Sequence, residues 1–255
     1  MWQRVELKSR AKQTVGRTYW RSVLAALILM ICTGGLSVVN SASNAYSSVN
    51  AQGDDVYYNF GGMLNGRASS LQDARITLLV LGTLVVAMSV ASLAGIAVRV
   101  FLLAPLEVGC QSFFIRNRMT DARIGEIGQV FRGNYLNVVK TQFLRSLFTF
   151  LWTLLLVIPG IVKGYEYRMI PYILAENPNM DYREAFRLSR EMMDGEKWNA
   201  FVLDLSFLGW NILSALTCNI LGIFYVDPYK ANTDAELYAV LKDKLFGGAA
   251  RPWES

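Results

Sequence analysis

The sequence contains no histidine among its 255 residues. Catalytic triads with an imidazole base, histidine general acids and histidine metal ligands are therefore excluded. Charge is also scarce, since Asp, Glu, Lys and Arg together make up 18% of the chain. Soluble domains usually carry about 25% charged residues, so this composition argues against an ordinary soluble protein.

Cysteine is rare as well, and the three cysteines stand far apart on apolar segments: Cys32, Cys110 and Cys218. Without a CxxC pair, their spacing indicates neither a zinc site nor a disulfide framework. The chain also lacks a GxxxxGK[ST] loop for phosphate. Two pairs of acids would need further oxygen ligands to hold a cation, and we interpret them as solvated turn residues: Asp54 with Asp55, and Asp227 with Asp234. We expect no metal, no cofactor and no catalytic site.

Long stretches without charge dominate the sequence, which is 53% hydrophobic. A helix needs roughly 20 apolar residues to cross hydrocarbon about 30 Å thick. Four stretches meet or approach that length, the third with help from Phe143 and Leu144: Ser22–Val39, Ile76–Val98, Ser146–Val162 and Leu205–Val226. Because backbone polar groups in lipid must be paired internally, each stretch should be a helix.

Shorter segments that mix apolar, aromatic and charged residues follow the last three stretches, at 99–115, 163–177 and 228–245. We predict an all-helical transmembrane bundle with six membrane segments in a single domain over residues 1–255. The first mixed segment either continues a long helix or lies at the inner interface, because the basic connection after it should stay inside. The second should return through the bundle. The third should also return, although Pro228 interrupts it.

Lys and Arg set the expected orientation. They are frequent in residues 1–21, whereas residues 40–73 hold only Arg67. The N-terminus should therefore be cytoplasmic and the loop 41–75 should face outward. A cleavable signal peptide is the alternative for the first stretch, but its apolar region exceeds the usual length of about 7 to 15 residues, which favours a retained anchor.

Residues 178–197 predict an amphipathic cytoplasmic helix. Asp181 and Glu184 have the spacing of a capping box. One face follows the i, i+3, i+4, i+7 pattern, and it comprises Tyr182, Ala185, Phe186, Ser189 and Met193. Such a helix either lies at the lipid headgroups or docks another protein, and the first interpretation is the more general one. Gly195 should end the helix before Trp198.

A bend is predicted at Pro159 and Gly160, since proline lacks an amide hydrogen and glycine accepts unusual conformations. If the chain reverses there, Lys163 lies near the outer interface and can snorkel. Arg168 follows Gly160 by eight residues and should lie about 12 Å deeper than the bend, where a charge needs a partner or a wet cavity.

Asp204 is the partner that we expect for Arg168, because it lies at a compatible depth on a helix entering from the inside. Side chains lean toward helix N-termini, which counts against direct contact, and Lys163 could pair locally with Glu166. The spacing of Asp204, Asn211 and Cys218 keeps one helical face, which either lines a pathway or joins neighbouring helices. The hypothesis is an intramembrane polar site drawn from Arg168, Asp204, Glu166, Lys163, Asn211 and Glu107.

Several long, ordered strings carry a resemblance to a known family: "IPGIVKGYEYRMIPYILAENP", "LSREMMDGEKW", "LDLSFLGW" and, earlier, "VELKSRAK" and "APLEVGCQSFFI". They resemble a bacterial family of integral membrane proteins known as domain of unknown function 975. More distantly, the chain is similar to the membrane portions of some glycerophosphodiester phosphodiesterases. The resemblance covers nearly the whole chain except the outer loop. It implies a multi-pass protein of the bacterial plasma membrane and transfers no catalytic residues.

Two functions from different classes are compatible with these features. The first is a non-enzymatic accessory or scaffold component of a membrane complex, with membrane lipids and another membrane protein as partners. The alternative is a transporter or lipid-handling protein that uses the intramembrane polar site. A membrane enzyme ranks third. Nucleic acid is not expected as a partner, because the basic residues flank apolar runs rather than an aromatic-studded groove.

Overall fold

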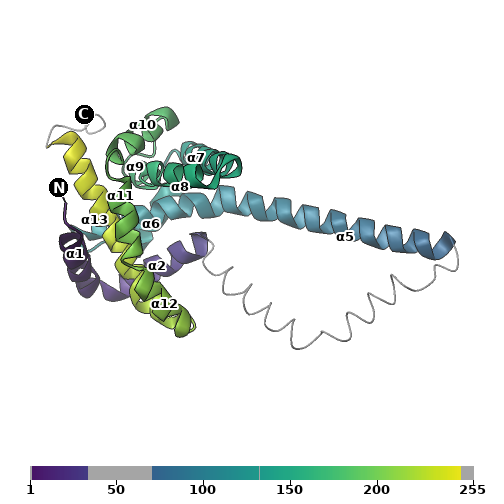
Figure 1. Ribbon diagram of the computed structural model, residues 1–255, viewed down its shortest axis with the longest axis horizontal. Helices are drawn as coiled ribbons and strands as arrows, with labels where there is room; N and C mark the ends of the chain where they lie inside the picture. Colours follow the sequence, from purple (N-terminus) through teal and green to yellow (C-terminus); the bar gives the residue numbers. More distant parts are fainter. Residues whose placement is uncertain (1, 34–70, 132, 248–255) are drawn as a thin grey trace. The chain divides into compact units, whose positions relative to one another are not determined.

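The computed structural model describes residues 2–33, 71–131 and 133–247 (Figure 1). Every regular element in these ranges is a helix, so the all-helical class is confirmed for this part of the chain. The chain divides into two compact units, Met1–Thr33 with Val100–Ser255 and Gly34–Arg99. Most of the predicted outer loop 41–75 lies outside the described residues, and its last residues belong to a helix that begins at Leu71.

The first unit contains most of the described helices. They are α1 (Arg4–Arg17), α2 (Tyr19–Thr33), α6 (Ala104–Asn117), the 3-10 helix η2 (Ile124–Phe131), α7 (Tyr135–Leu155), α8 (Val157–Glu166), α9 (Ile170–Glu176), α10 (Tyr182–Met192), α11 (Lys197–Leu205), α12 (Leu208–Leu216), the π-helical turn η3 (Gly222–Val226) and α13 (Asp227–Phe246). A second π-helical turn, η1 (Arg99–Leu103), leads into α6, so segment 99–115 continues a helix, as one of the two interpretations expected.

The described helix of the second unit is α5 (Leu71–Val98). Large apolar side chains are exposed along it, among them Val85, Met88, Leu93 and Ile96. The hydroxyls of Ser89 and Ser92 donate to carbonyl oxygens one turn earlier in the same helix, at 2.7 and 2.8 Å. Both serines therefore bond within their own helix, among exposed apolar side chains.

Two helical stretches are long and apolar enough to cross a membrane, namely Val85–Asn117 and Lys197–Leu216. The helices α1 and α2 would make a third only if they counted as one span, and they are bent by 109°. The six membrane segments that the sequence predicted are thus not found as long helices in the part of the chain described. The physical reason is that two of the four apolar stretches turn back on themselves.

The stretch Ser146–Val162 forms a helical hairpin of α7 and α8. Leu156 separates the helices with extended dihedrals, φ −157 and ψ 134. The break falls just before the predicted bend at Pro159, which lies in the first turn of α8, where a missing amide hydrogen costs little. Gly160 is needed for close packing rather than for a turn conformation, because a Cβ at this position would lie 2.6 Å from the Cα of Thr153. Glycine permits the two helices to pack closely.

The stretch Leu205–Val226 forms a second hairpin rather than one helix. Its turn contains Cys218 and Asn219, both in the left-handed region with φ 51 and 64. Trp210 packs against Tyr225 with ring centroids 5.5 Å apart, and Phe207 packs against Tyr229 at 5.4 Å. These pairings require α11 and α12 to run antiparallel to η3 and α13. Pro228 does not interrupt the returning arm, because it lies in the first turn of α13.

The amphipathic helix α10 buries its apolar face inside the first unit. Ala185, Phe186 and Leu188 are buried, and the helix packs against α7, α9 and α13. The Asp181 carboxylate accepts from the Arg183 amide at 3.2 Å, whereas Glu184 pairs with Arg187 and does not complete a capping box. The apolar face of α10 is therefore not free to dock another protein.

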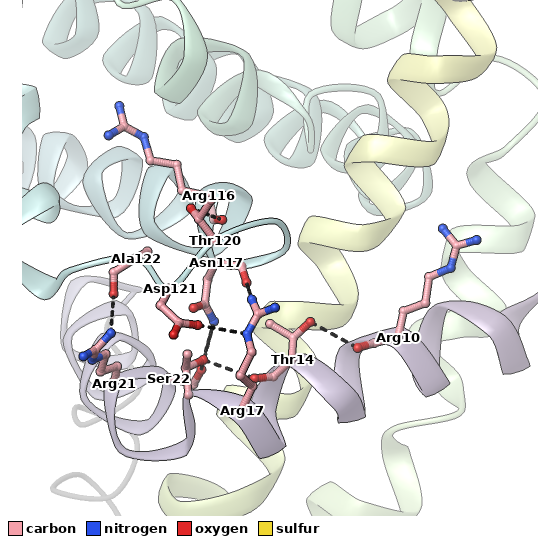
Figure 2. A network of polar contacts seen from close by, with 11 residues as sticks. Arg10, Thr14, Arg17, Arg21, Ser22, Arg116, Asn117, Thr120, Asp121 and Ala122 are labelled. Carbon is pink, nitrogen blue, oxygen red and sulfur yellow. Dashed lines mark hydrogen bonds and ion pairs between the residues drawn. The ribbon is translucent and has the colours of Figure 1, made fainter.

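A polar network holds the bend between α1 and α2 against the end of α6 (Figure 2). Arg17 donates to the Asn117 carbonyl oxygen at 2.6 Å and lies 3.0 Å from the Asp121 carboxylate. The buried Asn117 amide donates to the Thr18 hydroxyl at 2.7 Å and to the Ser22 hydroxyl at 3.3 Å. Arg17, which the sequence indicated only as a topology signal, thus also positions the N-terminal helices.

Candidate functional site

Arg168 lies at the centre of the most elaborate charge cluster in the described residues. It follows α8 in the turn before α9, and its guanidinium donates to both carboxylate oxygens of Asp204 at 2.8 and 3.1 Å. The same guanidinium donates to Asp234 on α13 at 2.8 Å. The Arg168 side chain is only 15% exposed. One buried cation therefore joins the two hairpins through α11 and α13.

Two further side chains complete this cluster. The Tyr165 hydroxyl donates to Asp204 at 2.9 Å, and the Lys230 ammonium lies 3.5 Å from the same carboxylate. We call Arg168, Asp204, Lys230 and Asp234 the ion cluster. It holds two cations and two carboxylates and is formally neutral. A bidentate guanidinium contact with a carboxylate is among the stronger charged hydrogen bonds in proteins.

A cavity of about 320 Å³ opens beside the ion cluster. Its lining residues come from α8, the turn after it, α11 and α13, and they are Ile161, Gly164, Tyr165, Arg168, Asp204, Lys230 and Asp234. Lys230 is the cluster's most exposed charge, with 37% of its side chain accessible. The lining therefore combines the charged groups of the ion cluster with the Tyr165 hydroxyl and the apolar side chain of Ile161.

Glu166 belongs to a separate cluster on the other side of α8. It accepts from Lys163 at 2.6 Å, as the i, i+3 spacing suggested, and from Lys197 at 2.5 Å. The Lys163 ammonium also lies 5.5 Å from the centroid of the Trp152 ring on the facing arm of the hairpin. Lys163 and Glu166 thus fasten α8 to α7 and α11 and do not line the cavity.

The other residues of the predicted site lie apart. Glu107 on α6 pairs with Arg145 on α7 at 3.1 Å. Asn211 is exposed on α12, and Cys218 lies outside that helix in the turn. The seven-residue trace from Asp204 to Cys218 therefore does not form one face of one continuous helix.

Sequence reasoning missed Tyr165, Lys230 and Asp234 as members of the site. Asp234 had been interpreted as a solvated turn residue together with Asp227, but it lies on α13 and points at Arg168. A signal was available, because Lys230 and Asp234 are four residues apart, which places them on one helical face. The interpretation of Pro228 as a break concealed it.

Glu196, just before α11, connects the N-terminus to the ends of the second hairpin that lie away from its turn. It accepts from the Trp2 indole at 3.0 Å, from Asn199 at 2.8 Å and from Lys244 at 2.6 Å. Burial alone would raise the pKa of this carboxyl, but the hydrogen bonds from Asn199 and Lys244 outweigh it and lower the pKa below its usual value. Glu196 is therefore held as a carboxylate.

These features define the chain as a helical protein with two hairpins joined by buried ion pairs. Residues 141–244 match the model of a family described as "Protein of unknown function (DUF975)". The match contains nearly all of both hairpins and the whole ion cluster, and it leaves out α1, α2, α5 and α6. No curated protein and no solved structure matches the chain.

Proposed function

We propose that the protein is a non-enzymatic multi-pass protein of the bacterial plasma membrane that serves as an accessory or scaffold component of a membrane complex. Its N-terminus is cytoplasmic, as the distribution of Lys and Arg favours. The membrane-embedded parts are α2, α5 and the two hairpins, in place of six full spans. The distant resemblance to the membrane portions of glycerophosphodiester phosphodiesterases fits the same setting.

The observation that carries this proposal is the contrast between the two ends of each hairpin. At the tips, large apolar side chains are exposed, with Ile158 and Leu216 each 76% accessible. At the other ends, the charged side chains pair with one another in the ion cluster and around Glu166. A soluble protein rarely leaves so much apolar surface in water, whereas lipid or a membrane partner would cover it.

The state of Arg168 favours a structural role for the ion cluster. Its guanidinium already contacts both oxygens of Asp204 and one of Asp234. A ligand anion would thus meet a cation whose charge two carboxylates already balance. Removal of either partner from a buried ion pair within one protein destabilises it, which is the behaviour of a structural contact.

One observation favours the alternative, a transporter or lipid-handling protein. The cavity of about 320 Å³ beside the ion cluster is large enough for a small polar group, and Lys230 and Tyr165 line it. In this case Lys230, the most exposed cation of the cluster, would contact the ligand first.

Gentle extraction from native membranes separates the two functions. Mass spectrometry would identify the proteins and lipids that co-purify with the unmodified chain, with Arg168→Ala and with Lys230→Ala. Arg187→Ala is the matched control, because Arg187 lies exposed on α10 and pairs only within that helix.

A stoichiometric protein retained by all variants supports the accessory role. A defined lipid or small molecule that is lost from Arg168→Ala and Lys230→Ala, and kept by Arg187→Ala, supports the alternative. Release of the chain from membranes by alkaline carbonate would contradict the membrane assignment itself.

A further inference from the structure

In the first hairpin, each arm is free of charged residues over only a short distance from the tip at Leu156. At the helical rise of 1.5 Å per residue, Arg145 lies about 16 Å before the tip and Lys163 about 10 Å after it. The residues between them carry no charge. Leu154, Leu155, Val157 and Ile158 are all exposed around the turn.

The second hairpin repeats these dimensions. Asp204 lies about 18 Å before the end of α12 at Leu216, and on the returning arm Asp227 and Lys230 lie about 10 and 15 Å beyond Ile220. Leu216, Ile220 and Phe224 are exposed near this tip. Both hairpins therefore present an uncharged depth of about 10 to 18 Å, whereas the hydrocarbon core is about 30 Å thick.

Hydrogen bonds pair several polar groups at both turns, which lowers the cost of placing these turns in lipid. The Leu156 amide donates to the Trp152 carbonyl oxygen, and Leu156 accepts from the Gly160 amide, each at 3.1 Å. In the other turn, the Asn219 amide donates to the Ser214 carbonyl oxygen at 2.8 Å, and the two side chains bond to each other at 2.8 Å.

Two threonines in the first arm of the first hairpin also bond inside their own helix. Thr149 and Thr153 donate to carbonyl oxygens one turn earlier, at 2.9 and 2.8 Å. Tyr165 and Tyr229 lie about 14 Å from the tips, the depth at which an aromatic side chain meets the headgroups of one leaflet.

We infer that each hairpin inserts its apolar tip into the acyl chains of one leaflet and returns to the same side without crossing the bilayer. The inference rests on the proposed membrane function and names the partner of the two tips, which is the lipid of the cytoplasmic leaflet. A full crossing would draw Asp204, Lys230 and Asp234 into the hydrocarbon. Insertion to half the depth leaves the ion cluster and its cavity at the level of the headgroups.

Cys218 supplies a native reporter for this geometry, because it lies exposed in the second turn while Cys32 and Cys110 are buried. The test labels it with a membrane-impermeant maleimide in intact cells and in inverted membrane vesicles. Cys218→Ser gives the background. In that background, Leu156→Cys reports on the first turn and Arg187→Cys on the exposed face of α10.

For half-depth insertion, Cys218 and Leu156→Cys are labelled from neither side but react fully after denaturation in detergent, and Arg187→Cys is labelled only in inverted vesicles. Labelling of Cys218 or Leu156→Cys in intact cells means a full crossing and overturns the inference. Labelling in inverted vesicles means that the tips lie outside the lipid and overturns it too. In both cases a chain that resists carbonate extraction leaves the membrane assignment intact, so the two failures are distinguishable.

A second measurement separates cover by lipid from cover by a protein. A bimane fluorophore on Cys218 of the purified chain is quenched in phosphatidylcholine vesicles brominated at acyl carbons 4,5 or 11,12. Stronger quenching by the 11,12 lipid is expected, because the tip lies near the bilayer centre. Equal or absent quenching would overturn the inference, even if the maleimide failed to react.

Discussion

Gly160 lies directly against Thr153 across the turn between α7 and α8. A side chain at position 160 would place its first carbon 2.5 Å from the Thr153 hydroxyl oxygen and 2.6 Å from the Cα. The hydroxyl could rotate away, but the backbone carbon cannot. The close packing of the first hairpin therefore depends on a glycine at this position.

Gly160→Ala is expected to destabilise the folded protein by about 1 to 3 kcal/mol, the usual cost of overpacking a close contact. Thermal unfolding in detergent, followed by tryptophan fluorescence, measures the change. Gly164→Ala is the matched control on the same helix, because nothing lies within 4 Å of a Cβ at that position. It should be neutral or slightly stabilising, since alanine favours a helix. Equal losses in both variants would show that the Thr153 contact is unimportant.

The hairpins show where sequence reasoning stops for the fold. In a sequence, one long span and two short antiparallel arms can have the same length and the same apolar composition. Leu205–Val226 is therefore predicted as a single helix. Pro159 and Gly160 indicated a bend within a few residues of the true break, because proline is tolerated in the first turn of a helix. The turn at Cys218 and Asn219 carries only one residue that favours left-handed dihedrals, which is too weak a signal.

The buried Asn117 amide provides a second test, on the bend between α1 and α2. Asn117→Ala removes the hydrogen bonds to Thr18 and Ser22. The loss should be about 1 to 3 kcal/mol, because the buried hydroxyls lose a donor. Amide hydrogen exchange in α1 should accelerate, since two of the hydrogen bonds that hold the bend to α6 are lost. Thr120→Ala is the control, because that hydroxyl bonds only to the nearby Arg116 carbonyl oxygen. Unchanged exchange in α1 would assign the bend to other contacts.

Glu196 predicts a pH dependence of stability. Its pKa in the folded state is lowered, because hydrogen bonds from Asn199, Lys244 and Trp2 outweigh the effect of burial. A carboxyl with a depressed folded pKa stabilises the protein above its unfolded pKa, near 4.5, and loses that contribution as the pH falls through the folded value. The melting temperature should therefore drop below about pH 4.5.

Glu196→Gln should be less stable than the unmodified chain at neutral pH and should show a shallower drop in melting temperature on acidification. Glu6→Gln serves as the control, because that carboxylate lies exposed on α1. Parallel profiles for the unmodified chain and Glu196→Gln, measured from pH 7 to pH 3, would rule out Glu196 as a source of the acid sensitivity.

The ion cluster shows the same limit for the site. The pairing of Arg168 with Asp204 could be predicted from the sequence, because the depths of the two residues along their helices can be compared from the helical rise alone. Asp234 was missed, because its place on α13 depends on a hairpin that the sequence does not reveal. A pairing between distant segments can thus be inferred when both depths are known, but a third partner requires the fold.

The second carboxylate changes what substitutions at Arg168 should do. Asp204→Asn leaves Arg168 with Asp234 and is expected to cost less than Arg168→Met, which takes the guanidinium from Asp234 and leaves Asp204 with Tyr165 and Lys230. The loss for Arg168→Met should be about 2 to 4 kcal/mol, because it breaks a largely buried pair. Arg168→Met combined with Asp204→Asn should restore only part of this, since Asp234 still lacks its partner. Thermal unfolding of the three variants gives the comparison.

Arg168→Lys separates geometry from charge. Lysine keeps the positive charge, but its ammonium lacks the planar fork of a guanidinium. It therefore cannot contact both oxygens of Asp204 and also reach Asp234 in one fixed geometry. A loss of about 1 to 2 kcal/mol is expected in thermal unfolding, smaller than that of Arg168→Met. The exposed control Arg187→Lys should be unchanged within about 0.5 kcal/mol. If Arg168→Lys proved as stable as the unmodified chain, charge alone would hold the hairpins together, and the planar fork that joins α11 to α13 would have no structural role.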